Sequence, residues 1–98
     1  MKTPSGNDIL RILSEQREEL ARRFSVTSIA LFGSFARGDE NSGSDVDILV
    51  EFAEPTFDHY MDLKFHVEDL LGRPVDLVMS DTVKSRIKPM IEREALYA

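Results

Sequence analysis

Along the first quarter of the chain, apolar residues recur at the spacing of an α-helix and charged residues fill much of the opposite face. The apolar positions of this stretch are Ile9, Leu10, Leu13, Leu20 and Phe24. Just before it, Ser5 to Asn7 offers side-chain oxygens that accept hydrogen bonds from the free N–H groups of a helix start. The pattern predicts a first helix over about residues 7–24.

Two stretches after this helix have the composition of strands. Val26 to Gly33 is rich in β-branched and apolar residues and ends at a Gly-Ser pair. Ser34 to Arg37 can start a short helix, whereas Gly38 to Ser44 consists almost entirely of turn-forming residues. Asp45 to Phe52 alternates aspartate with valine and then continues as an apolar run. We predict two strands joined by a short helix and a turn.

The second half of the chain predicts a helix, a short strand and a further helical region. The helix spans Phe57 to Leu71 and stops at Gly72. Its expected inward residues are Phe57, Met61, Phe65 and Leu70. Pro74 to Met79 reads as a third strand, and Pro89 suits the first turn of a last helix. The resulting order β-α-β-α-β predicts a two-layer α/β (α+β) fold.

Length and composition fit a single domain over residues 1–98. Hydrophobic residues make up 42% of the 98 positions, which is enough for a two-layer core, and no repeat or linker divides the chain. No apolar run approaches the ~20 residues of a membrane span, and the N-terminal residues lack a signal-peptide core. We therefore expect a cytoplasmic protein with no membrane partner.

The chain is acidic and contains no cysteine. It has 18 Asp and Glu against 12 Lys and Arg, for a net charge of −6. Nucleic-acid binding relies on Lys and Arg to neutralise phosphates, so a direct nucleic-acid partner is disfavoured. The lack of cysteine excludes disulfides, thiolate zinc sites and cysteine nucleophiles. An acidic chain that handles phosphates needs a divalent cation to offset the repulsion.

Residues on both sides of the turn carry candidate chemistry. Asp45 and Asp47 are two apart on a predicted strand, so their carboxylates point to the same face. Their repulsion raises the pKa of one carboxyl unless a divalent cation such as Mg²⁺ binds between them. Gly33 and Ser34 lie where a strand ends and a helix can begin, which offers phosphate a close backbone approach and free N–H groups.

Asp76 is a third candidate, because it interrupts the apolar segment Pro74–Met79. If that strand neighbours the Asp45/Asp47 strand, the three carboxylates can hold two metal ions and activate a hydroxyl for attack on phosphorus. Taken singly, each feature also has an ordinary explanation as a solvated turn or an outward strand residue. Together, Gly-Ser-x10-Asp-x-Asp is expected by chance in about one chain in a thousand of this length. Arg37 can contact a phosphate or order the loop that follows it.

These motifs resemble the signature of the DNA-polymerase-β-like nucleotidyltransferase superfamily, and the run from Gly33 to Gly38 resembles its minimal branch, the MNT domains. MNT domains are typically encoded beside HEPN proteins as toxin–antitoxin pairs. The resemblance implies a short mixed sheet with helices packed on one side. It also implies that Asp45 and Asp47 bind Mg²⁺, that Asp76 helps to bind metal and activates the acceptor, and that Gly33 and Ser34 hold the phosphates of the NTP.

The acceptor class follows from what the short chain lacks. Larger members of the superfamily carry a second domain that holds the acceptor, so here the acceptor must bring its own binding surface. The resemblance then implies AMP transfer from ATP to a tyrosine of a HEPN-type toxin. Two alternatives remain: an antitoxin that masks its partner stoichiometrically, and adenylylation of a small molecule with a separate acceptor-binding subunit. We expect the partner to dock over the Gly38–Ser44 loop through its acidic residues Asp39 and Glu40.

Overall fold

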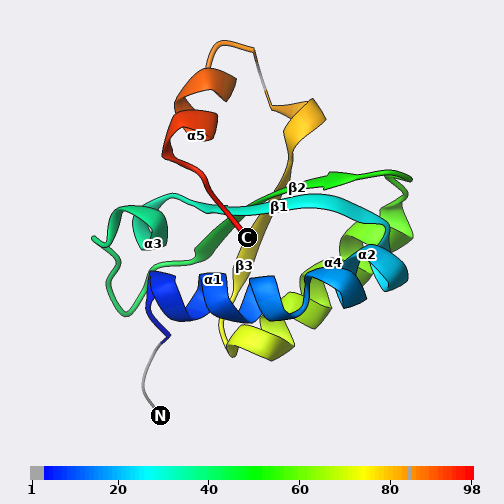
Figure 1. The fold of residues 1–98 in the computed structure, drawn as a ribbon. Helices are drawn as coiled ribbons and strands as arrows, with labels where there is room; N and C mark the ends of the chain where they lie inside the picture. Colours follow the sequence, from blue (N-terminus) through cyan, green and yellow to red (C-terminus); the bar gives the residue numbers. More distant parts are fainter. Residues whose placement is uncertain (1–3, 84) are drawn as a thin grey trace.

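The computed structural model describes residues 4–83 and 85–98 (Figure 1). Its helices are α1 (Gly6–Glu15), α2 (Arg17–Phe24), α3 (Ser34–Arg37), α4 (Phe57–Leu71), the 3₁₀ turn η1 (Ser80–Thr82) and α5 (Lys88–Glu94). Its strands are β1 (Val26–Phe32), β2 (Val46–Phe52), β3 (Val75–Met79) and β4 (Leu96–Tyr97).

The four strands form one mixed sheet in the order β3-β2-β1-β4. β1 is antiparallel to both β2 and β4, whereas β2 and β3 are parallel. Helices α1, α2 and α4 lie together against one face of this sheet, and α5 lies on the opposite side (Figure 1). The expected mixed sheet with its main helices on one side is confirmed, although the short α5 lies on the other side (Figure 1).

The first helix is broken, contrary to the single helix expected over residues 7–24. Ser5 caps α1 as predicted: its Oγ accepts from the Asp8 N–H, and the Asp8 carboxylate accepts from the Ser5 N–H, both at 3.1 Å. Gln16 then ends α1 and begins α2. The break could not be predicted, because neither glycine nor proline is present there and the helical spacing of apolar residues continues from α1 into α2.

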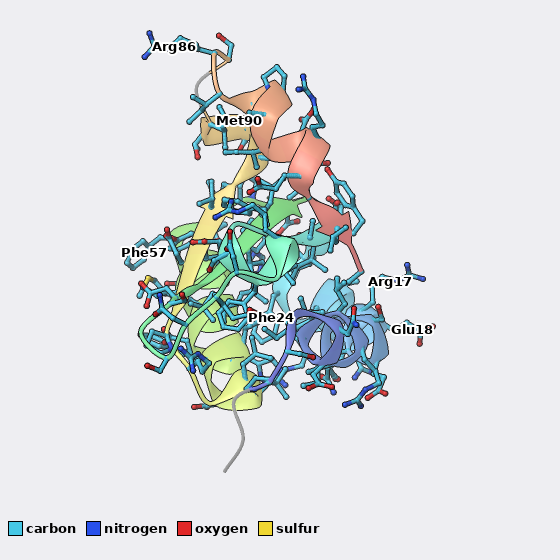
Figure 2. All side chains as sticks on the ribbon, turned by 90° about the vertical axis from the view of Figure 1, so that its left-hand side faces the viewer. Arg17, Glu18, Phe24, Phe57, Arg86 and Met90 are labelled. Atoms are coloured by element: carbon cyan, nitrogen blue, oxygen red, sulfur yellow. The ribbon has the colours of Figure 1, made fainter. Side chains whose placement is uncertain are left out.

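The buried core lies between the sheet and the three long helices. Leu20 and Phe24 of α2 are buried in it together with Ile29 of β1 and Ile48 of β2. Phe24 points into this layer, while Arg17 and Glu18 of the same helix point outward (Figure 2). Across the described residues, no helix has the length and apolar character that crossing a membrane requires.

Helix α4 has the predicted bounds, with Gly72 in the left-handed conformation at its end, but its inward face was predicted wrongly. Leu63, Val67 and Leu71 are buried, whereas Phe57 and Phe65 are 76% and 56% exposed. The helix carries two apolar stripes of equal spacing, so periodicity alone does not choose between them. The stripe of Leu63, Val67 and Leu71 packs into the core, and the Tyr60 hydroxyl donates to the Leu77 carbonyl of β3 at 2.6 Å.

The C-terminal region is helical only in part. Pro89 lies in the first turn of α5, as predicted. After α5 the chain forms β4, which pairs with β1 through Ala30 and Leu31 and was not predicted. Two residues are too few to show an alternating pattern, so this strand has no sequence signal.

Candidate active site

Two of the three predicted aspartates lie side by side on adjacent parallel strands. Asp47 of β2 is in register with Asp76 of β3. Asp45 was expected to begin the second strand, but β2 begins at Val46, so Asp45 lies one residue before it. Asp47 is half-buried, while Asp45 and Asp76 are exposed. Neighbouring strands are about 4.8 Å apart, so β2 and β3 bring Asp47 and Asp76 close together at this end of the sheet.

The electrostatics of Asp47 reflect this crowding. Burial raises the pKa of its carboxyl above the ordinary value, and the carboxylates of Asp76 and Asp45 raise it further. The Arg37 guanidinium opposes this effect by favouring the charged form. Asp76 and Asp45 therefore both disfavour the charged form of Asp47.

Gly33 brings the end of β1 against Asp47. It follows Phe32, which is in register with Asp47, and it has φ 74° and ψ −153°. A Cβ at this position would lie 2.1 Å from Asp47 Oδ2, so even an alanine would collide with the carboxylate. Both the positive φ and the close approach require glycine here. Ser34 then begins α3, so the Gly-Ser turn stands directly beside Asp47.

Arg37 is held between two carboxylates. Its Nε donates to Asp39 Oδ2 at 3.0 Å, and its Nη1 donates to Glu94 at 3.2 and 3.3 Å. Glu94 also accepts a hydrogen bond from the Gly33 N–H at 2.8 Å. Glu94 was not predicted as a site residue, because it lies 57 residues from Arg37 at the end of a charged helix.

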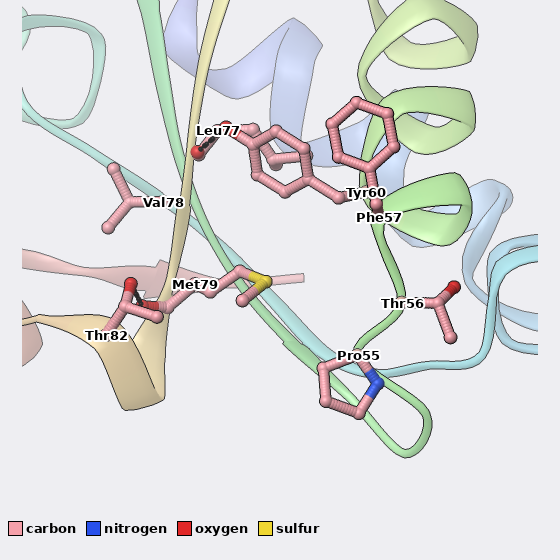
Figure 3. Close-up of a pocket in the computed structure, with 8 residues that line it drawn as sticks. All are labelled: Pro55, Thr56, Phe57, Tyr60, Leu77, Val78, Met79 and Thr82. Atoms are coloured by element: carbon pink, nitrogen blue, oxygen red, sulfur yellow. Dashed lines mark hydrogen bonds between the residues drawn. The ribbon is translucent and has the colours of Figure 1, made fainter.

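Other nearby features do not join this group. Glu51 lies on the same face of β2 by parity, but its carboxylate accepts from the hydroxyls of Thr27 and Ser80, both at 3.4 Å. An apolar groove of about 460 Å³ lies between α4 and β3 and is lined in part by Phe57, Tyr60 and Met79 (Figure 3). None of the three aspartates lines it. The aspartate cluster, and not the groove, therefore carries the candidate chemistry.

The aspartates supply the donor chemistry of a magnesium site without forming a finished one. Among residues 4–83 and 85–98, no three or more His, Cys, Asp or Glu side chains are grouped so that they could hold a metal ion as they stand. Carboxylate oxygens are nevertheless the ligands that Mg²⁺ prefers. A divalent cation would also relieve the repulsion that raises the pKa of Asp47. The metal-binding role of Asp45, Asp47 and Asp76 stays a prediction.

Adjacent aspartates on neighbouring parallel strands beside a glycine turn are the arrangement expected of a nucleotidyltransferase, and the sheet agrees with that class. The chain belongs to the nucleotidyltransferase domain family, whose model matches residues 13–98. It is thus a nucleotidyltransferase, and the family resemblance in its sequence is confirmed.

Similar proteins agree with this assignment. The chain is 44% identical over 91 residues to a protein named protein adenylyltransferase MntA from Thermococcus cleftensis, covering 92% of each chain. A solved structure described as a putative minimal nucleotidyltransferase matches with a TM-score of 0.73 and 35% identity, over 89% of this chain and 93% of that one. A Shewanella oneidensis structure, described as a tri-AMPylated HEPN toxin in complex with an MNT antitoxin, has the same fold, with a TM-score of 0.63 and 20% identity over 90% and 70% of the two chains.

Proposed function

We propose that this chain, as a single minimal domain, transfers AMP from ATP to a tyrosine hydroxyl of a HEPN-type toxin and so acts as its antitoxin. The observation that carries the proposal is the Asp47–Asp76 pair beside the Gly33-Ser34 turn. The name of the Thermococcus cleftensis relative supports protein adenylylation as the reaction. The toxin–antitoxin complex of the same fold supports a HEPN-type partner.

Each site residue has a role in this proposal. Asp45, Asp47 and Asp76 would hold two Mg²⁺ ions, which would neutralise charge on the triphosphate when bound. Ser34 and Arg37 donate hydrogen bonds to the phosphates, and Gly33 lets the backbone approach them. A magnesium ion suits these residues because the carboxylates of Asp76 and Asp45 raise the pKa of Asp47, and a bound divalent cation would offset this repulsion.

The reaction is a substitution at the α-phosphorus of ATP. Asp76 accepts the proton of the acceptor hydroxyl, whose oxygen forms the new bond to phosphorus. The bond from the α-phosphorus to the oxygen bridging it to the β-phosphate breaks, and pyrophosphate leaves. Asp76 suits this role because, of the neighbouring Asp47 and Asp76, it is the exposed one and can reach an acceptor that approaches from solvent.

The acceptor class is tested by following where the label goes. The protein is incubated with Mg²⁺, ATP labelled at the α-phosphate and the small helical protein encoded by a neighbouring gene. Label that becomes covalently attached to a tyrosine of the neighbouring gene's product supports the proposal. Neutralisation of the neighbour without label indicates stoichiometric masking, and label on a small molecule indicates a different acceptor class. The matched controls are Asp47→Asn, which loses the central carboxylate, and Asp62→Asn, which alters an exposed carboxylate of α4.

A further inference from the structure

The C-terminal helix is tied to the glycine turn by one of its carboxylates. Glu94, the last residue of α5, accepts from the Gly33 N–H at 2.8 Å and from Arg37 Nη1 at 3.2 and 3.3 Å. Gly33 and Arg37 lie 61 and 57 residues before it in the sequence. The side chain of Glu94 thus joins the last helix to both ends of α3.

Both residues that Glu94 contacts, Gly33 and Arg37, influence Asp47. The Gly33 main chain leaves no room for a Cβ beside Asp47 Oδ2, so any shift of Gly33 changes the space available to that carboxylate. Arg37 brings the positive charge that counteracts the effect of burial on the pKa of Asp47. The negative charge of Glu94 has a lesser effect on that carboxyl. Glu94 therefore acts on Asp47 chiefly through the two residues that it holds.

The position of Glu94 is fixed by the elements around it. Its side chain is 27% exposed, against 51% for Arg37, so the pair is partly shielded from water. Charge-assisted hydrogen bonds of this kind are stronger than neutral ones. The chain enters Glu94 from α5 and continues almost directly into β4, which is paired with Ala30 and Leu31 of β1.

We propose that Glu94 is a positioning residue of the nucleotide site, which fixes the Gly33 turn and the Arg37 guanidinium in the geometry that receives a triphosphate. The inference rests on the proposed function for the identity of the ligand. The Gly33 N–H already donates to Glu94, so the donors left for phosphate are those of Ser34 and the remaining N–H groups of Arg37. Gly33 itself contributes by having no side chain, which lets the backbone lie close to Asp47.

The test compares Glu94→Ala and Glu94→Gln with Glu92→Ala. Glu92 is a matched control, because it is on the same helix and its carboxylate pairs with Lys88 at 4.0 Å, not with the turn. Two quantities are measured: the hydrogen-exchange rate of the Gly33 amide by NMR, and the affinity with Mg²⁺, by calorimetry, for an ATP analogue whose α- and β-phosphates are joined by a methylene group, which cannot transfer AMP. The kcat and KM for transfer are measured in parallel.

We expect Glu94→Ala to speed exchange at Gly33 and to weaken nucleotide affinity by about tenfold or more, since a hydrogen bond to a charged group contributes about a decade in an equilibrium constant. The loss should appear in KM more than in kcat. Glu94→Gln keeps an oxygen for the Gly33 N–H, so it should retain the slow exchange and lose less affinity. Glu92→Ala should behave as the wild type.

Unchanged Gly33 exchange together with unchanged affinity in Glu94→Ala would overturn the proposal. Tighter nucleotide binding would also overturn it, because Glu94 would then compete with phosphate. If Glu94→Ala does not fold, Glu94→Gln, Arg37→Gln and the double variant are compared instead. Because Glu94→Gln acts on nucleotide binding through Arg37, the double variant should lose no more affinity than the single variant with the larger loss. A wild-type protein that binds no nucleotide contradicts the proposed function, whereas Gly33 exchange still tests the role of Glu94.

Discussion

Replacing Asp47 by asparagine should stabilise the protein when no divalent cation is present. Asp47 is in register with Asp76 on the adjacent parallel strand, and Asp45 adds a third negative charge. Two unit charges about 5 Å apart repel by roughly 0.8 kcal/mol in bulk water and roughly 3 kcal/mol near a protein surface. Since Asp47 is only half-buried, solvent screening favours the lower part of that range, about 1–2 kcal/mol. For a domain of this size, that corresponds to a rise in Tm of about 5–10 °C.

The stabilisation by Asp47→Asn should depend on pH. Because the folded-state pKa of Asp47 is raised above its ordinary value of 3.8, the stability linked to its protonation is fully present below that value. That stability is lost as the pH rises through the folded-state pKa. The difference between Asp47→Asn and wild type should therefore be largest near neutral pH and vanish below about pH 3.8.

The assay is thermal unfolding followed by circular dichroism in EDTA at neutral pH, repeated at acidic pH and with Mg²⁺. Asp62→Asn on α4 serves as the control, because it removes an exposed carboxylate of the same type. Mg²⁺ should raise the Tm of the wild type and leave Asp47→Asn nearly unchanged. An Asp47→Asn variant that melts at or below the wild-type temperature in EDTA would show that charge repulsion at Asp47 does not destabilise the metal-free protein.

Three further predictions concern the core, the glycine turn and the docking loop. In urea denaturation, Leu63→Ala should cost about 2–5 kcal/mol, and the exposed Phe65→Ala should cost less than about 1 kcal/mol. Gly33→Ala should abolish transfer because its Cβ would strike the carboxylate 2.1 Å away, whereas Gly38→Ala has open space around it and should lose only about 1 kcal/mol of stability. Glu40→Lys should slow association with the partner at low salt, as measured by surface plasmon resonance; equal rates for variant and wild type would place the partner elsewhere.

Local chemistry explains which parts of the fold could be predicted. Ser5 and Gly72 are read correctly because helix caps depend on a few adjacent residues. Asp47 and Asp76 could be singled out because each interrupts the apolar residues of a short strand, whereas their pairing across β2 and β3 was only a condition of the prediction. Such features are visible in sequence because the reason for each lies within a few positions.

Tertiary contacts decide what could not be predicted. The rotation of α4 depends on which of its apolar stripes packs into the core, and the role of Glu94 depends on a contact across most of the chain. One local contact was missed as well: Asp39 is paired with Arg37, two residues before it, at 3.0 Å, so the docking prediction needs revision. Reversing the charge of Asp39 would disturb the site itself, so Glu40 is the cleaner probe of docking.

The central claim is that the clustered aspartates perform nucleotidyl transfer. The most direct measurement is intact-mass spectrometry of the partner protein after incubation with ATP, Mg²⁺ and either wild type, Asp47→Asn, Asp76→Asn or Asp62→Asn. We expect addition of one or more AMP units by wild type and Asp62→Asn, and none by Asp47→Asn or Asp76→Asn once each variant is shown to be folded. Transfer at the wild-type rate by Asp47→Asn or Asp76→Asn would contradict the central claim.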